Sequence, residues 1–260
     1  IFNTGAGDLL FNFVGQNPDP TVHIFAFTYG VDLLLEYPNT IGGIGKYFSD
    51  YNLDTTNSID PTYFQNKLIG KDVLLMSAQK TGSTNHIPIL GPMILDFVIN
   101  GGTVIVCGSL ANGSQNSIYS MGLFTGNYIL NTNSGIAIAS NLSDDFMNGI
   151  PPIFNMTTSS YLHNITNTDK IVLASNNGDD LITYRNIGAG KALYLGFNYH
   201  DVNDAIEKII SNAVRFSKGK RLLPWISVDT LAGSILPNDS SKIDVTIFSH
   251  GLNGGAYNGY

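Results

Sequence analysis

The chain has 260 residues, of which 43% are hydrophobic and 11% aromatic, enough apolar material for a packed core. Only 13% of the residues are charged, and the net charge is −7 without any long cluster of Lys and Arg. This composition excludes a globally disordered chain and argues against nucleic-acid binding through phosphate neutralisation. Asn, Ser, Thr and Gly replace the missing charges, a surface composition common in secreted and cell-surface proteins.

Cysteine content and hydropathy narrow the class of protein further. Cys107 is the single cysteine, so no intrachain disulfide framework exists. No apolar run approaches the ~20 residues of a membrane-spanning helix. The chain starts at Ile1 without a basic leader, so we expect any signal peptide to be absent or already removed. Five Asn-x-Ser/Thr sequons are candidate glycosylation sites, at Asn112, Asn141, Asn155, Asn164 and Asn238.

Residues 1–20 form a separate N-terminal segment. An apolar patch at residues 9–14 precedes Gly15 and the turn-forming residues 18–20. We expect the tail of an upstream module followed by a linker. The alternative is an extra edge strand of the main domain.

Apolar strands and amphipathic helices alternate from Val22 onward. The mostly apolar run at residues 22–27 is typical of a strand buried on both faces. The alternation predicts βαβ crossovers and a parallel sheet. Strands are expected at 22–27, 52–55, 71–77 and 103–108, and helices at 41–51, 61–68 and 87–100.

The alternation loosens after Met121. A hairpin turn at residues 186–190 joins two expected strands, and a helix at 203–216 ends the domain before a polar linker at 218–221. The strands expected in this region are 136–139, 171–174, 181–185 and 192–197.

Residues 222–260 have the pattern of an incomplete β module. Alternating apolar residues at 226–228 and 243–247 predict two short strands separated by Gly and Pro-Asn-Asp turn residues. An independent sandwich needs about seven strands. We therefore expect the chain to stop inside a module of a longer protein.

Several segments of the main domain resemble one known superfamily. Residues 101–108, 188–198 and the helix end at 212–216 are similar to class I glutamine amidotransferase-like proteins, especially the ThuA-like branch. Residues 144–150 resemble an acidic loop of that branch. The resemblance covers about residues 22–216 and implies an α/β fold with a parallel, flavodoxin-like sheet.

The C-terminal segment resembles the immunoglobulin-like modules that follow other domains in bacterial secreted proteins. The resemblance rests on Trp225, a Gly-x-Ile-x-Pro turn and a Gly-x-Tyr end. The expected organisation is therefore an upstream tail and linker at 1–20, a glutamine amidotransferase-like α/β domain at 21–217, and a partial Ig-like β module at 222–260.

The superfamily resemblance implies a Cys nucleophile on a strained elbow and a His followed two residues later by Glu. Cys107 and His200 stand close to the corresponding positions. Ile105 and Ser109 replace the Gly residues that flank the Cys, however, and Val202 stands where the Glu is expected. A thiolate nucleophile needs a base that a carboxylate orients, so this site is degenerate.

We therefore assign no catalytic residue and leave enzymatic activity open, favouring its absence. The candidates for a residual site are Cys107, His200 and Asp201, with Asp204 as a substitute carboxylate. The alternative is that both residues have only a structural role, with Cys107 as a small buried residue at a strand end and His200 at the border of the terminal helix.

No metal or cofactor is predicted. The oxygen-rich segments 176–180 and 238–240 lack the spacing of a calcium loop, and turn formation explains both. The Gly-rich segment 42–46 lacks the phosphate-loop pattern.

The function expected from these observations is a non-catalytic structural or interaction segment of a large modular protein, secreted or on the cell surface, of the adhesin, filament or surface-layer type. Its partners would be other modules of the same parent protein or neighbouring subunits. One alternative is a secreted hydrolase, or an accessory domain of one, that uses the Cys107–His200 pair. The other is a carbohydrate-binding module at the carboxyl ends of the strands, with glycans stacking on Tyr119, Tyr128, Tyr161 and Tyr199.

Overall fold

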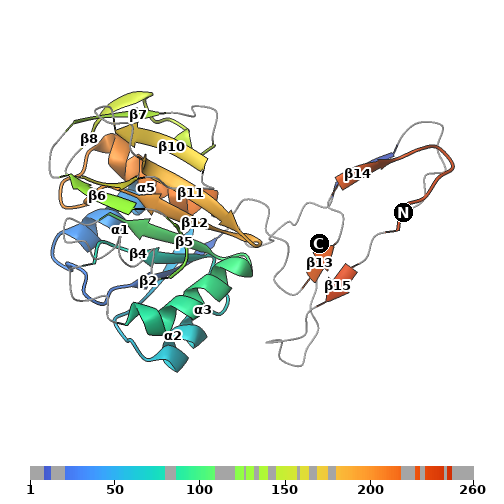
Figure 1. The fold of residues 1–260 in the computed structure, drawn as a ribbon, viewed down its shortest axis with the longest axis horizontal. Coiled ribbons are helices and arrows are strands. Elements are labelled where there is room, and N and C mark those ends of the chain that lie inside the picture. Colours follow the sequence, from blue (N-terminus) through green and yellow to red (C-terminus); the bar gives the residue numbers. More distant parts are fainter. Residues whose placement is uncertain are drawn as a thin grey trace. The chain divides into compact units, whose positions relative to one another are not determined.

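Two compact units make up the chain in the computed structural model (Figure 1). The larger unit is Thr21–Lys218, and the smaller one joins Ile1–Pro20 with Gly219–Tyr260. The structure describes residues 9–12, 21–79, 86–108, 121–125, 127–131, 135–139, 145–156, 159–163, 169–174, 180–217, 226–228, 232–242 and 245–247.

The larger unit contains helices and strands in alternation, followed by a strand-rich region. Its strands are β2 (Val22–Phe27), β3 (Tyr51–Thr56), β4 (Val73–Met76), β5 (Thr103–Cys107), β6 (Asn127–Asn131), β7 (Gly135–Ala139), β8 (Ile153–Met156), β9 (Ser159–His163), β10 (Asp169–Ala174), β11 (Asp180–Ile187) and β12 (Gly190–Leu195). Its helices are α1 (Glu36–Tyr47), α2 (Pro61–Leu68), α3 (Ile87–Ile99), the short 3-10 helix η1 (Asp145–Met147) and α5 (Asp204–Phe216).

These strands form an 11-stranded sheet with a parallel centre. Five neighbouring strands, in the order β3-β2-β4-β5-β12, pair in parallel. This is the strand order of flavodoxin-like sheets, with the first strand inside and the second at the edge. From β12 the sheet continues antiparallel through β11, β10, β7 and β8, and β9 links β6 to β11. The expected α/β class with a parallel, flavodoxin-like centre is thereby confirmed.

Helices cover both faces of β2, β4 and β5, which is why these strands are mostly apolar and buried, whereas the edge strand β3 keeps exposed polar residues. Along β2, Ile24 and Ala26 belong to the core under α1 and α5, whereas Phe25 and Phe27 belong to the core under α2 and α3. Figure 1 shows α2 and α3 together on one side of the sheet. Because side chains alternate between faces, a strand covered twice has no solvent-facing positions.

The N-termini of α2 and α5 follow the capping rules. The Asp60 Oδ1 accepts a hydrogen bond of 2.7 Å from the Tyr63 N–H, with Pro61 at the first helical position of α2. The Asn203 Oδ1 accepts from the Ile206 N–H at 3.1 Å at the start of α5. Both helices thus begin within a residue of the predicted position.

Helix α1 differs from the expected range 41–51 at both ends. The Asp32 Oδ1 accepts from the Leu34 and Leu35 N–H groups at 2.8 and 3.2 Å, so the chain turns early and the helix starts at Glu36. Pro38 is tolerated because it lies in the first turn. The helix ends at Tyr47, since Phe48 is extended and β3 begins three residues later.

The smaller unit contains two two-stranded sheets among its described residues. β1 (Leu9–Asn12) pairs antiparallel with β14 (Ala232–Ile235), and β13 (Ile226–Val228) pairs antiparallel with β15 (Val245–Ile247). β1 is therefore not an edge strand of the large sheet. β14 lies in a segment that was expected to be a turn, and no Ig-like sandwich is formed by the described strands.

In the described part of the chain, no helix combines the length and hydropathy needed to cross a membrane.

Candidate functional site

Parallel α/β sheets bind ligands at the carboxyl ends of their strands, next to the point where strand order reverses. Here the reversal lies between β2 and β4, because β3 lies on one side of β2 and all later parallel strands lie on the other. The residues at this edge are Ser77 after β4, Cys107 at the end of β5, and the segment 198–200 after β12.

Ser77 and Cys107 lie side by side on neighbouring strands. The register pairs Leu75 with Ile105 and Met76 with Val106, so the next position sets Ser77 opposite Cys107. Leu75, Ile105 and Cys107 share the core under α1 and α5, so Ser77, two residues after Leu75, faces the same side. Ser77 is 1% exposed, and its Oγ has no hydrogen-bond partner.

Cys107 is completely buried and carries a free thiol. Burial raises the pKa of this thiol far above its ordinary value, and the negative charge of Glu36 in the first turn of α1 raises it further. The thiol is therefore protonated at neutral pH. Since the thiolate is the nucleophile, Cys107 in this environment is inert.

Tyr199 belongs to the same core cluster as Cys107 and carries a second unpaired hydroxyl. The side chain is fully buried and its Oη has no hydrogen-bond partner. Burial raises the pKa of Tyr199, and the nearby Cys107 raises it further. The segment is held to α1 by Asn39, whose Nδ2 donates to the Tyr199 carbonyl at 2.8 Å and to the His200 carbonyl at 3.2 Å.

The sequence-predicted partners of Cys107 do not reach it. His200 and Asp201 are exposed, and the His200 backbone N–H donates to the Asn198 Oδ1 at 3.0 Å. No hydrogen bond joins His200 to Cys107 anywhere in the described chain. The structure thus groups Cys107 with Ser77 and Tyr199 instead of the expected His and Asp.

Two of the residues that form this site were missed or misread from sequence. Ser77 received no role, because it was expected to be the last residue of the strand 71–77, whereas Cys107 was named from the superfamily resemblance. Tyr199 was named as a stacking surface for glycans, but its ring is buried and presents no such surface.

Some of the remaining predicted positions lie on other elements, and others fall outside the described residues. Asn155 on β8 and Asn238 are exposed. The Gly-rich residues 42–46 lie inside α1, where Gly43 allows close packing against α5: a Cβ there would meet Ile210 Cγ2 at 3.0 Å. Tyr128 and Tyr161 lie on the paired strands β6 and β9. Outside the described residues are Ser109, Asn112, Tyr119, Asn141, Asp144, Asn164, residues 175–179 and Trp225.

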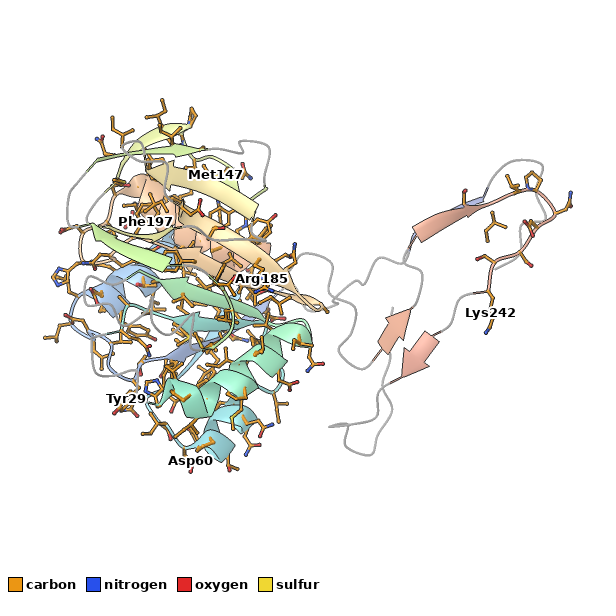
Figure 2. All side chains as sticks on the ribbon, viewed as in Figure 1. Tyr29, Asp60, Met147, Arg185, Phe197 and Lys242 are labelled. Atoms are coloured by element: carbon orange, nitrogen blue, oxygen red, sulfur yellow. The ribbon has the colours of Figure 1, made fainter. Side chains whose placement is uncertain are left out.

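A different polar group lies on the other face of the same edge. His86, just before α3, is 4% exposed, and neither ring nitrogen has a hydrogen-bond partner. Its ring packs on Phe27 at 5.1 Å and on Tyr29 at 4.8 Å between centroids (Tyr29 is labelled in Figure 2). Burial lowers the pKa of His86, so the imidazole is neutral at neutral pH.

Metal ligands do not gather in the described part of the chain: no group of three or more His, Cys, Asp or Glu side chains has the geometry to hold an ion there.

Comparisons with solved structures place the fold. A ThuA-like protein from Bacteroides uniformis matches 81% of this chain and 95% of its own, with a TM-score of 0.56 at 13% identity. Two Salmonella typhimurium cytoplasmic proteins match 75–76% of this chain: STM3548 over 98% of its length (TM-score 0.53, 12% identity) and STM1381 over 99% (TM-score 0.57, 9% identity). No family model and no curated protein matches.

These comparisons support the glutamine amidotransferase-like fold and correct the expected function. The predicted role as a structural segment of a large modular surface protein is wrong, because the two cytoplasmic proteins are matched over almost their whole length as small standalone domains. The two alternatives, a secreted hydrolase and a carbohydrate-binding module, are contradicted by the same comparisons. At 9–13% identity the likeness shows the fold alone.

The same finding contradicts the predicted secreted or cell-surface location. It also contradicts the predicted extracellular, Ig-like and glycoprotein features. The partners named from sequence, and the expected lack of nucleic-acid binding, remain predictions.

Proposed function

We propose that this chain is a small-molecule-binding protein whose ligand sits beside Cys107 at the carboxyl ends of β4 and β5. The Cys107 thiol performs no chemistry in this proposal, because it is buried and protonated. One observation carries the proposal: the buried hydroxyl groups of Ser77 and Tyr199 both lack partners, Ser77 at the register position next to Cys107 and Tyr199 in the same core cluster as Cys107.

The physical argument is that burying these hydroxyls without hydrogen-bond partners lowers the stability of the protein. Each buried polar group without a partner costs about 1–3 kcal/mol, and native proteins contain few of them. Two in one place, at the sheet edge where this fold class binds ligands, indicate groups kept for a ligand that supplies the missing hydrogen bonds.

Access to the site requires the segment 198–200 to move. The hydroxyl oxygens of Ser77 and Tyr199 have essentially no exposed surface, so the structure is a closed state. The Asn39 amide of α1 makes the two hydrogen bonds that hold this segment to the helix. Breaking them releases Tyr199 from α1 and admits a small ligand.

The proposal is tested with the double variant Ser77→Ala, Tyr199→Phe, which deletes both hydroxyls and keeps the apolar framework. Mass spectrometry of extracts from freshly purified protein compares the small molecules that wild type and variant retain. Urea unfolding of both proteins, refolded to remove any ligand, gives the free energy of unfolding. Tyr63→Phe, an exposed tyrosine on α2, is the control.

We expect the ligand-free double variant to be more stable than ligand-free wild type, by about 1 kcal/mol or more, because two unpaired hydroxyls are gone. The co-purified compound should disappear from the variant and remain in the control. A variant that is less stable and retains the same compounds as wild type would refute the proposal.

A further inference from the structure

We infer that a second copy of this chain pairs with the outer edge of β3, so that the sheets of two copies join into one around a two-fold axis. The inference goes beyond the proposed function, because the site beside Cys107 takes no part in it. It rests on a stretch of chain, residues 21–79, that the structure describes without a gap.

β3 is an end strand of the large sheet, and β2 is its single neighbour among the described strands. Their hydrogen-bond ladder begins where the Val22 N–H donates to the Asp50 carbonyl at 2.8 Å. It ends where the Thr28 N–H donates to the Thr56 carbonyl, also at 2.8 Å. In a parallel ladder every second residue turns both its N–H and its C=O to the same neighbour. The even-numbered positions of β3 therefore face β2, and positions 51, 53 and 55 face outward.

The outward backbone groups of β3 are open. Leu53 and Thr55 are exposed, and no hydrogen bond within the described chain reaches their N–H and C=O groups. A row of unpaired backbone groups at a sheet edge is a template for pairing with another strand, and proteins usually block it with a proline, a bulge or a charge. β3 contains no proline, and its register with β2 is unbroken over all six residues.

The one charged side chain of β3 does not block the edge either. The Asp54 carboxylate accepts from the Lys67 Nζ at 3.0 Å and from the Lys71 Nζ at 3.3 Å, so its charge is balanced within the same copy. The other end of the main strand order differs, because the Asn155 carbonyl of β8 accepts from the Asn203 Nδ2 at 2.9 Å. The chain thus caps the β8 end itself and leaves the β3 end open.

The backbone of β3 is complementary to a second copy of itself. Around a two-fold axis at Leu53, each Leu53 N–H donates to the Leu53 carbonyl of the other copy. Each Thr55 N–H donates to the Tyr51 carbonyl of the other copy. Antiparallel pairs exchange hydrogen bonds in this way at alternate positions, and two-fold dimers with self-complementary interfaces are the commonest oligomers.

The side chains favour the same register. Asn52 lies opposite Asp54 of the other copy, so an amide donor meets a carboxylate. The Leu53 side chain, 37% exposed in the single chain, meets its own copy at the axis and loses apolar exposure there. A register that set the two Asp54 carboxylates opposite each other would be unfavourable. Charge and apolar contact therefore both select the pairing centred on Leu53.

Sedimentation velocity of the full chain at several concentrations tests for the dimer. Leu53→Lys places like charges opposite each other at the axis. Ile138→Lys is the matched control, because Ile138 is a strand residue on β7 that is 40% exposed. We expect wild type and the control to share one monomer–dimer equilibrium, and Leu53→Lys to dimerise at least about tenfold more weakly. Circular dichroism checks that each variant is folded.

A disulfide tests the register and does not depend on the strength of the dimer. In the proposed pairing the two Leu53 Cα atoms lie about 5.5 Å apart, within the reach of a disulfide. The two Asn52 Cα atoms lie roughly 8 Å apart, beyond that reach. Under mild oxidation Leu53→Cys should form cross-linked dimers and Asn52→Cys should not. The native Cys107 is buried, so it does not compete in either variant.

Wild type that stays monomeric at every concentration, together with Leu53→Cys that does not cross-link, overturns the inference. A dimer that Leu53→Lys leaves unchanged also overturns it. Equal cross-linking of Leu53→Cys and Asn52→Cys would indicate random collision and would overturn the proposed pairing. If Leu53→Lys fails to fold, the two cysteine variants decide. None of these outcomes bears on ligand binding beside Cys107, so the proposed function stands or falls separately.

Discussion

The two sides of the sheet edge bury different kinds of polar side chain. On the α1/α5 side, the Ser77 and Tyr199 hydroxyls lie unpaired beside a buried thiol. On the α2/α3 side, a single imidazole, His86, is enclosed by the rings of Phe27 and Tyr29. Hydroxyls rotate and adapt to a ligand without changing charge, whereas the His86 imidazole, whose pKa burial lowers, gains a charge when the pH falls below its ordinary pKa. One side is thus suited to binding and the other couples folding to pH.

The largest expected effect concerns Cys107 and tests whether the α1/α5 side is closed. We expect iodoacetamide to modify Cys107 at least about 1,000-fold more slowly in the native chain than in urea, because the thiol is buried and protonated and must wait for an opening that costs several kcal/mol. Mass spectrometry of timed aliquots measures the rate. Native and unfolded rates within tenfold of each other would contradict the closed state.

The second prediction concerns the α2/α3 side and its dependence on pH. The pKa of His86 is lowered below its ordinary value of 6.5, so the unfolded chain takes up a proton more readily than the folded one. The contribution of neutral His86 to the free energy of unfolding is therefore fully present above about pH 6.5. It is lost as the pH falls toward the lower, folded-state pKa. Each unit of difference between the two pKa values is worth about 1.4 kcal/mol.

Urea unfolding at about pH 7 and pH 5 measures this loss in wild type and in His86→Gln, whose side chain does not titrate in this range. We expect the variant to lose less stability than wild type over the interval. His200→Gln, which removes an exposed imidazole, is the matched control. Equal losses of stability in wild type and His86→Gln would contradict the prediction that His86 makes the stability of this side depend on pH.

The smallest expected effect concerns the Asn39 hydrogen bonds that hold Tyr199 against α1. Asn39→Ala removes both bonds from an intermediate-exposure site, so we expect a loss of about 1 kcal/mol in the free energy of unfolding. Alkylation of Cys107 should become about fivefold faster. The loss of unfolding free energy between about pH 7 and pH 5, which depends on His86, should stay unchanged. Asn66→Ala on α2 is a control for a lost surface amide, and equal acceleration in both variants would contradict the role of Asn39.

The parallel centre of the sheet was predictable because its inner strands β2, β4 and β5 are buried on both faces. β4 and β5 consist of Val, Leu, Ile, Met, Thr and Cys, and such runs bounded by helices have one interpretation. The antiparallel extension was harder: β6, β8 and β9 contain Asn, Ser and His, were not expected, and depend on pairing with distant strands for their conformation.

The candidate site was only half predictable for the same reason. Cys107 was placed correctly at a strand end, since the strand itself was clear. The proximity of Ser77 to Cys107 depends on β4 and β5 being neighbours in register, and the approach of Tyr199 depends on hydrogen bonds from Asn39. Neither contact leaves a local pattern in the sequence.

The pairing of β1 with β14 has a consequence for how the chain folds. Its partners, such as Leu9 and Ile235, lie almost the whole chain apart, and the larger unit is inserted between them. A contact of such long sequence separation forms late, because loop closure must precede it. During synthesis the N-terminal strand must therefore wait, unpaired, until the entire α/β unit and the residues after it have been made.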